Sequence, residues 1–457
     1  MQYNCDFHIH SRFSGGVSDK MRLNVLAVES KKKGVHLIGT GDCLHPKWFS
    51  EILEMNKIDE GTFECNGARF ILTTELEDAK RVHHLILFPC KSSVDSFIEK
   101  IKGKHSPLDS DGRQKVHMFG AELAEIAKDV DALIGPAHAF TPWTGLYGSY
   151  NSIKECYEDM TKNISFIELG LSADSSYADR IEELRRYTYF TNSDAHSPYP
   201  SKLAREFNRL ELKELTYSEV KKAILREGGR KFVLNVGMPP EEGKYNRTAC
   251  IKCPSQYSLS EAVNLKWKCK CGGRLKKGVR ERVDELATYK EPQPPEYRPR
   301  YLHIIPLSEI IGKAFESAPT TRSVISEWEK LISSFESEVS ILVDEPIEKI
   351  NSVADERVSW AIECFREGKI VLHPGGGGRF GTIEIPSKKD SLNCKENNTN
   401  KENIEDAIKD KIENIKDTIK KNRIDNKKGN EEKAIENTKK IIDEKRKEKV
   451  QAKLFDF

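Results

Sequence analysis

The sequence predicts an α/β fold, a barrel of alternating strands and helices followed by a cysteine-rich module and a mainly helical segment. Three observations lead to this prediction. Apolar strand-like runs alternate with amphipathic helix-like runs over residues 1–237, which is typical of a parallel sheet, open or closed into a barrel. Histidines and carboxylates follow several of these runs, which favours a barrel with its site at the C-terminal ends of the strands. Four cysteines then gather between residues 250 and 271.

Length and composition narrow the class of protein. The chain has 457 residues, more than a single hydrophobic core usually holds, so we expect several domains. The formal net charge is only +2, so any surface for nucleic acid must be a local patch. No apolar run reaches membrane-spanning length and no secretory pattern opens the chain, which predicts a cytoplasmic protein with no membrane partner. The 11 cysteines are an odd number, which argues against a disulfide framework.

The order of the elements defines the expected domains. The strand-like runs are 35–40, 69–74, 84–88, 132–136, 165–169, 187–191 and 231–236, and the helix-like runs are 22–32, 119–128, 178–186 and 218–227. A cysteine-rich module and a proline-rich linker follow at 238–300, and a mainly helical segment at 301–385. Residues 386–450 contain no aromatic side chain and are rich in Lys, Glu and Asn, which predicts a solvated, flexible tether.

Metal-ligating side chains stand at the ends of separate strand-like runs. His8 and His10 are two residues apart, as are Asp194 and His196, so each pair lies on one face of a strand. Such a mixed set of histidines and carboxylates suits a centre of two or more Zn, Mn or Fe ions and metal-assisted hydrolysis. The candidate ligands are His8, His10, Asp42, His45, Glu75, His84, His138, Asp194 and His196, and the candidate catalytic residues are Glu75, His138, Asp194 and His196.

These motifs resemble those of the PHP (polymerase and histidinol phosphatase) superfamily. The matching segments are 6–11, 41–42, 74–75, 84–85, 136–138 and 193–196. The resemblance implies a distorted seven-stranded β/α barrel in residues 1–237 that holds two or three metals and acts as a phosphoesterase. His83 is the alternative to His84. The superfamily often has Ser-Asp-Gly after the first motif, whereas this chain has Ser14-Gly15-Gly16, so one metal site differs.

The second chemical feature is a set of paired cysteines. Cys250 and Cys253 form one pair and Cys269 and Cys271 a second, with glycines after the second pair, which predicts a structural Zn²⁺ site. A redox role for the first pair is the alternative. Basic and aromatic residues surround the cysteines, a mixture that suits a phosphate backbone and stacked bases. The candidate contacts with a DNA backbone are Lys268, Arg274 and Arg379.

A glycine run, Pro374 to Gly381, ends the helical segment. No Gly-Lys-Ser/Thr follows, so the run is not a Walker A loop. It either lets backbone N–H groups approach a phosphate or forms a β-turn.

The order of barrel, cysteine module, helical segment and glycine run resembles the endonuclease Q family over residues 1–385. The resemblance implies a DNA repair endonuclease that nicks DNA 5′ to uracil, hypoxanthine, xanthine and abasic sites and leaves 3′-hydroxyl and 5′-phosphate ends. It implies damaged single- or double-stranded DNA as partner, association with the nucleoid, and a requirement for Mg²⁺ or Mn²⁺ beside zinc. The candidate pocket for an extruded base is Phe140, Trp143, Glu168 and Ser172.

The last seven residues, 451–457, turn apolar again after the tether. Gln451, Leu454 and Phe457 resemble the peptide that binds the sliding clamp PCNA, although the usual second aromatic is absent. A chance apolar end is the other interpretation.

Two other functions remain open. A PHP phosphoesterase acting on a small phosphorylated metabolite or nucleotide fits the barrel but leaves the later segments without a use. A non-catalytic DNA-binding adaptor fits the later segments but gives the candidate metal ligands no function.

Overall fold

The computed structural model describes residues 1–388. Residues Met1–Pro386 form one compact unit, and a second unit begins at Ser387. Nearly all of the predicted tether, and the whole predicted clamp peptide, lie outside the described residues. Within the described residues no helix is long and apolar enough to cross a membrane.

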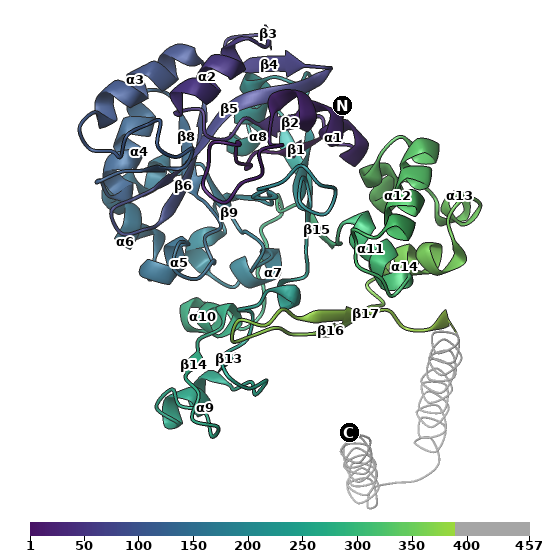
Figure 1. The fold of residues 1–457 in the computed structure, drawn as a ribbon. Coiled ribbons are helices and arrows are strands. Elements are labelled where there is room, and N and C mark those ends of the chain that lie inside the picture. Colours follow the sequence, from purple (N-terminus) through teal and green to yellow (C-terminus); the bar gives the residue numbers. More distant parts are fainter. Residues whose placement is uncertain (389–457) are drawn as a thin grey trace, which may run out of the picture. The chain divides into compact units, whose positions relative to one another are not determined.

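One large sheet organises the first part of the chain (Figure 1). Along its main path the strands are β15 (Arg300–His303), β12 (Lys231–Gly237), β11 (Phe207–Glu211), β1 (Gln2–Asp6), β2 (Leu37–Gly39), β5 (Ala68–Glu77), β4 (Thr62–Cys65) and β3 (Asn56–Lys57). Three further strands lie off this path: β6 (His83–Phe88) and β7 (Gln114–Lys115) pair with β5, and β8 (Leu133–Pro136) pairs with β6. A separate parallel pair consists of β9 (Phe166–Glu168) and β10 (Thr188–Phe190).

The sheet is mixed, whereas the alternation of strands and helices predicted a parallel one. Strands β1, β2 and β5 are parallel, but β5–β6, β6–β8, β1–β11 and β11–β12 are antiparallel. Only five residues separate Glu77 from His83. A connection that short can form a hairpin but not the crossover that a parallel pair requires.

The two sheets continue into one another around the interior. A parallel bridge joins Ile134 on β8 to Ile164, just before β9. On the other side, Asn235 Nδ2 of β12 donates to the carbonyl oxygen of Tyr189 on β10, at 3.2 Å. The seven-stranded form of this barrel stays a prediction.

Aromatic rings fill the centre of the sheet. Phe166 and Phe190 stack with centroids 4.1 Å apart, and Phe7 and Phe232 pack on Phe190 at 5.2 and 5.5 Å. Three of these rings belong to β9, β10 and β12, and Phe7 directly follows β1. Their close packing fixes where the residues that follow those strands can lie.

Helices cover the outside of the sheet, as Figure 1 shows for α2, α3 and α4. The helices of this part are α1 (Leu23–Lys33), α2 (Pro46–Leu53), α3 (Lys91–Ile101), α4 (Gly120–Asp129), α5 (Leu146–Ser149), α6 (Ile153–Tyr157), η1 (Glu158–Asn163), α7 (Ser175–Ala178), η2 (Glu182–Leu184), α8 (Tyr217–Leu225) and η3 (Pro240–Glu242). Helix α1 ends at Gly34, whose φ of 83° is left-handed, a conformation that favours glycine.

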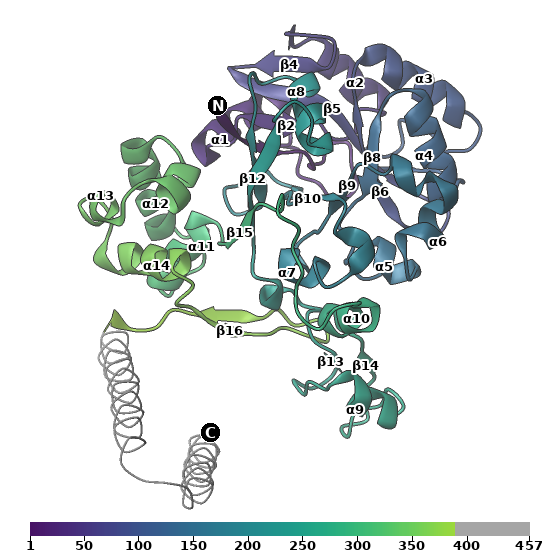
Figure 2. The same ribbon diagram turned by 180° about the vertical axis from the view of Figure 1, so that it is seen from behind.

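The cysteine module and the helical segment follow. The module contains β13 (Ala249–Cys250), α9 (Leu259–Asn264), β14 (Leu275–Lys276) and α10 (Val279–Leu286). The segment contains α11 (Leu307–Ala314), α12 (Arg322–Phe335), η4 (Ser340–Asp344), α13 (Ile347–Asn351) and α14 (Glu356–Arg366), and it ends in the ribbon β16 (Val371–His373) and β17 (Thr382–Glu384). Figure 2 shows α11 to α14 as a distinct group, so this part of the chain is partly helical.

Two ion pairs fasten this helical group to the sheet domain. Lys33 at the end of α1 pairs with Glu338, and both side chains are buried. Arg209 of β11 makes a two-pronged pair with Asp344, at 2.6 and 2.8 Å.

Candidate metal centre and adjoining cavity

A cluster of histidines and carboxylates lies where the strands end. His8 and His10 follow β1, Glu75 is near the end of β5, His138 follows β8, and Asp194 with His196 follows β10. These residues come together in three overlapping groups, each with its ligand atoms within 4.8 Å: His8, His10 and Glu75; His10, Asp194 and His196; Glu75, His83 and His138.

Glu75 is the central carboxylate of the cluster. Its Oε1 lies 2.7 Å from His83 Nδ1, 2.9 Å from His138 Nε2 and 3.6 Å from His8 Nε2. Its Oε2 lies 3.4 Å from His10 Nε2. A carboxylate that faces four imidazoles would help to hold metal ions, which would supply the activation of water for hydrolysis.

Asp194 faces the opposite side of the same space. Its Oδ1 lies 3.3 Å from His10 Nε2, 3.4 Å from His196 Nε2 and 3.8 Å from His8 Nε2. Its side chain is 32% exposed, whereas Glu75 is buried, so Asp194 is the carboxylate that solvent or a substrate can reach.

The donor set fits metal ions. His8 Nε2, His10 Nε2, Glu75 Oε2 and His138 Nδ1 are buried and have no hydrogen-bond partner. Buried polar atoms are rarely left unpaired, and three of these four face one another across the cluster. Imidazole nitrogens with carboxylate oxygens are ligands for Zn²⁺, Mn²⁺ or Fe²⁺.

Two predicted residues stand behind the histidines. Asp42, expected as a ligand, accepts from Ser11 N at 2.6 Å and lies 3.1 Å from His10 Nδ1. Glu168, expected in a base pocket, lies 2.9 Å from His8 Nδ1. A carboxylate on the second ring nitrogen fixes the imidazole's orientation and tautomer, and leaves Nε2 free to bind metal.

Two other expected ligands lie elsewhere. His45 caps α2, since its Nδ1 accepts from Trp48 N at 3.4 Å, and its ring stacks on Phe13. His84 is buried against Tyr157, with its Nδ1 2.7 Å from the hydroxyl. His83 joins the cluster instead, because adjacent strand residues point to opposite faces.

Charges within the cluster stabilise one another. Burial alone would raise the pKa of Glu75, but the surrounding histidines, foremost His83, hold that pKa well below its usual range. Burial would likewise lower the pKa of His8, but Glu168 and two further carboxylates raise it to about 9. The site therefore favours positive charge among its carboxylates, which metal ions would supply when bound.

Three residues of the site have unusual backbone conformations. The φ angles of Asp42, His138 and Asp194 are 46°, 29° and 47°. Non-glycine residues seldom adopt such angles, and their strain must be offset by the surrounding structure. The sharp turns after β2, β8 and β10 bring these side chains back over the strand ends.

A cavity of about 680 Å³ opens beside the cluster. Its wall includes His138 and Asp194, and it includes three of the four residues predicted for a base pocket, namely Trp143, Glu168 and Ser172. Phe140, the fourth, lines a neighbouring cavity with Trp143, which forms a wall of both.

Solved structures of known proteins share this fold. The lesion-specific endonuclease PfuEndoQ of Pyrococcus furiosus matches with a TM-score of 0.83 and 47% identity, covering 86% of this chain and 99% of that one. Endonuclease Q in complex with a 27-mer duplex substrate, with an abasic lesion at the active site, matches with a TM-score of 0.80 and 48% identity, covering 85% and 98%. The chain belongs to the endonuclease Q family.

Two curated relatives of this endonuclease Q family member are uncharacterized proteins. MJ0043 of Methanocaldococcus jannaschii is 40% identical over 300 residues, which is 63% of this chain but only 37% of that protein. YqxK of Bacillus subtilis is 31% identical over 402 residues, which covers 83% of this chain and 98% of that protein. Residues 306–369 match the family MJ0043 C-terminal domain, which corresponds to the helical group.

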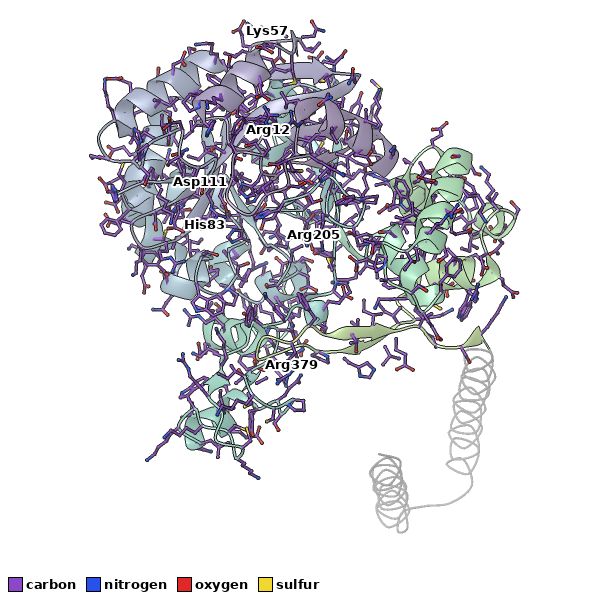
Figure 3. The ribbon with its side chains drawn as sticks, viewed as in Figure 1. Arg12, Lys57, His83, Asp111, Arg205 and Arg379 are labelled. Carbon is purple, nitrogen blue, oxygen red and sulfur yellow. The ribbon has the colours of Figure 1, made fainter. Side chains whose placement is uncertain are left out.

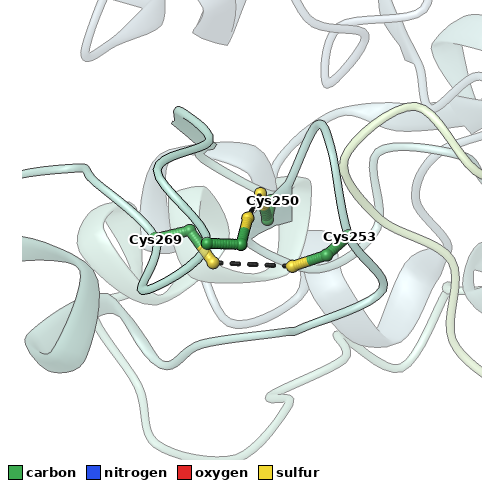
Figure 4. Close-up of side chains that lie close together, drawn as sticks. Cys250, Cys253 and Cys269 are labelled. Carbon is green, nitrogen blue, oxygen red and sulfur yellow. Dashed lines mark hydrogen bonds between the residues drawn. The ribbon is translucent and has the colours of Figure 1, made fainter.

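The four cysteines come together in the module, and Figure 4 labels three of them, Cys250, Cys253 and Cys269. Cys250 Sγ lies 3.5 Å from Cys271 Sγ, and Cys253 Sγ lies 3.5 Å from Cys269 Sγ. The hydroxyl of Ser255, followed by neighbouring thiols, lowers the pKa of Cys253 to about 6, which favours the thiolate that binds metal. Four sulfurs within 4.8 Å fit one tetrahedral ion.

The predicted DNA-backbone residues have different surroundings. Lys268 and Arg274 are exposed on the module, and Arg274 also lines the cavity next to Phe140. Arg379, at the end of the β16–β17 ribbon (Figure 3), points to the module. Its guanidinium donates to the carbonyl oxygens of Cys250, Lys252 and Cys253, which makes it a structural clamp.

The glycine run is a tight turn packed on backbone. Gly375 N donates to Glu241 O at 2.9 Å, and Gly378 N donates to Lys244 O at 3.0 Å. A Cβ added to Gly376 would come within 2.6 Å of Arg247 O. The glycines therefore allow a close approach to the backbone of residues 241–247, not to a ligand. This arrangement favours the β-turn over the phosphate loop.

Arg113 was missed in the sequence. It lies on an irregular loop between α3 and β7, with NH1 3.5 Å from Glu75 Oε2. Asp111 of the same loop accepts from Gly15 N at 3.3 Å, at the position where related motifs carry an aspartate. No periodic pattern marks this loop, so only the fold shows that it covers the cluster.

Proposed function

We propose that this protein is a metal-dependent DNA repair endonuclease that nicks the strand 5′ to deaminated bases and abasic sites, leaving 3′-hydroxyl and 5′-phosphate ends. Membership of the endonuclease Q family supports this role. The observation that carries it is the placement of the unpaired nitrogens and oxygens of His8, His10 and Glu75 beside a cavity with aromatic walls. Such a site can hydrolyse a phosphodiester while a neighbouring nucleotide is bound separately.

The residues that would hold the ions are His8, His10, Glu75, His83, His138, Asp194 and His196. Bound ions would polarise the phosphate and lower the pKa of a bound water. Asp194 is the exposed carboxylate of the set, so it orients the attacking water and accepts its proton. Arg113 holds a fixed positive charge beside Glu75, where it contacts a phosphate oxygen and stabilises the charge that develops there.

The cavity takes the damaged nucleotide. A volume of about 680 Å³ falls within the usual range for ligand sites. Damaged or mispaired bases leave the stack at lower cost than paired ones, so an extruded nucleotide in this cavity distinguishes lesions from normal DNA. Trp143 and Ser172 supply an aromatic face and a hydroxyl to the base.

In this proposal zinc holds the cysteine module in shape, and the module forms part of the DNA-binding surface. Lys268 and Arg274 follow the phosphate backbone. The clamp peptide Gln451, Leu454 and Phe457 recruits PCNA, and nucleoid association follows from DNA binding. A pull-down with PCNA of the full chain against a chain ending at residue 450 tests that partner, and equal capture of both would reject it.

The activity is tested on end-labelled duplexes that carry one uracil, hypoxanthine, xanthine or abasic site, with Mg²⁺ or Mn²⁺. We expect one nick 5′ to each lesion and none in undamaged DNA, and the variants His8→Ala and Asp194→Asn should bind the DNA without cutting it. An intact lesion strand after incubation with the wild-type protein rejects the proposal. Turnover of histidinol phosphate or nucleoside monophosphates in its place would support the small-molecule phosphoesterase.

A further inference from the structure

Phe380 is an apolar side chain that the fold leaves in solvent. Its side chain is 73% exposed, and it lies on the turn that joins β16 to β17. Single exposed apolar residues are common, so exposure alone implies nothing. Phe380, however, also forms part of the wall of the cavity that contains Asp194 and His138.

The turn that carries Phe380 is held rigidly on both sides. Before it, Arg379 donates to three carbonyl oxygens of the cysteine module, at 2.8 to 3.1 Å. After it, Gly381 N donates to Glu242 O at 3.1 Å. These hydrogen bonds anchor the backbone on either side of Phe380, so less conformational freedom is lost when the ring contacts a ligand.

The surroundings of Phe380 suit a nucleic acid. Lys244 Nζ lies 5.6 Å from the centre of the phenyl ring and 5.4 Å from that of Tyr245. Trp143 packs edge-on against Tyr245 at 5.0 Å, and Lys276 Nζ lies 3.4 Å above the indole ring. Aromatic faces interleaved with cations bind stacked bases and phosphates together.

We infer that Phe380 is the wedge that enters the base stack when the damaged nucleotide moves into the cavity. This inference rests on the proposed function. An extruded nucleotide leaves a gap between its neighbours, and apolar side chains that enter such gaps hold the duplex open. The phenyl ring stacks on the adjacent base pair and replaces the contacts that the extruded base has lost.

The wedge predicts a dependence on the form of the substrate. Phe380→Ala should reduce kcat/KM on a duplex lesion by about 5- to 100-fold, the usual range for loss of one base–aromatic stack. A lesion inside a three-nucleotide unpaired bubble needs no wedge, and its incision should change by less than about twofold. Phe380→Leu keeps an apolar tip and should restore most of the duplex activity.

Base unstacking is read out separately from incision. We would place 2-aminopurine beside an abasic site and bind this duplex with Asp194→Asn protein, which does not cut. The fluorescence should rise on binding, and it should rise much less with the double variant Asp194→Asn/Phe380→Ala. Phe119→Ala is the matched control, because Phe119 is 53% exposed at the start of α4 and does not line the cavity.

Different results would reject the wedge role of Phe380 and the proposed endonuclease function. Equal losses on duplex and bubble would mean that Phe380 contacts the extruded nucleotide itself, and would overturn the wedge. Unchanged duplex incision or an unchanged fluorescence rise would overturn it as well. If the wild-type protein cuts no lesion, the proposed function fails, while the fluorescence still decides whether Phe380 opens the stack. Equal zinc content and unfolding temperature in all variants would confirm that the turn remains folded.

Discussion

Two carboxylates determine how the histidines of the cluster are oriented. Glu168 accepts from Asn192 Nδ2 at 2.7 Å and from the backbone N–H of His138 at 2.8 Å, while it contacts His8. Asp42 has the same role behind His10. The sequence could not separate these residues from ligands, because a backing carboxylate and a ligating carboxylate have the same chemistry and follow the same strand ends.

Glu168→Gln should lower the affinity for catalytic metal by about 10- to 100-fold, as loss of such backing partners usually does. Metal titration of the chelated protein, followed by incision at each metal concentration, measures this change. Excess Mn²⁺ should restore most of the activity. If Glu168 contacts only the base, metal affinity stays unchanged and KM rises instead.

Glu206 predicts a pH dependence of stability. Burial raises the pKa of Glu206 from 4.5 to about 8, although the hydrogen bond from Met238 N and the charge of Arg205 oppose the shift. Between about pH 4.5 and pH 8 the unfolded chain has released this proton, whereas the folded protein keeps it. The free energy of unfolding therefore falls by about 1.4 kcal/mol per pH unit across that window.

Glu206→Gln mimics the protonated form and should remove this dependence, so the variant should exceed the wild-type protein in stability at pH 8 and match it near pH 4. Urea unfolding at several pH values measures the free energy of unfolding of both proteins. The effects of the other titrating groups cancel in the difference between the two values. Parallel stability curves across this range would exclude a protonated Glu206.

At the scale of elements, helix α1 and the helical group depend on one buried ion pair. Glu338 accepts from Lys33, from Leu307 N at 3.1 Å and from Trp328 Nε1 at 2.8 Å. Lys33→Met leaves this carboxylate buried without its cation, and we expect a loss of about 3–5 kcal/mol in unfolding free energy. Denaturant titration measures it.

The matched control is Lys32→Met, since Lys32 is 42% exposed and pairs with Glu29 on the surface. We expect it to change stability by less than about 0.5 kcal/mol. Adding Glu338→Gln to Lys33→Met should recover part of the loss, and a double variant less stable than the single one would contradict the buried-charge explanation.

The elements also show what the sequence could and could not predict. The spacing of His8 and His10 was sufficient to place both on one face, because both belong to one strand end. The choice between His83 and His84 depended on the register of β5 against β6, where Leu76 pairs with His84 and Glu77 with His83. Arg113 lies on a loop without periodicity, so the contact with Glu75 could not be inferred from its sequence.

At the scale of the whole molecule, a metal ion bound by the four cysteines would supply the stability that the cysteine module lacks. Its buried apolar cluster consists of only Cys250, Ala262, Cys269 and Leu275, and a core of that size does not fold by itself. The module should therefore depend on zinc for its structure, as small zinc domains do.

Cys269→Ser should lower the zinc content by one ion per chain and leave the catalytic ions in place. Metal analysis and thermal unfolding measure the two effects, and the sheet domain should keep its main transition. Cys90→Ser, which changes a thiol outside any cysteine cluster, is the control. A Cys269→Ser protein that retains all its zinc would show that the four thiols do not form the site.

The hydrogen bonds of Arg379 connect the oxidation state of the module's thiols to the position of Phe380. Its three carbonyl partners belong to Cys250, Lys252 and Cys253, so the shape of the cysteine module determines where the neighbouring Phe380 lies. If the four thiols hold zinc as proposed, their oxidation would release it, loosen the turn and displace Phe380, without altering the histidine cluster. If Phe380 is the wedge, such a protein would still cut lesions in unpaired DNA but would lose most of its incision in duplex DNA.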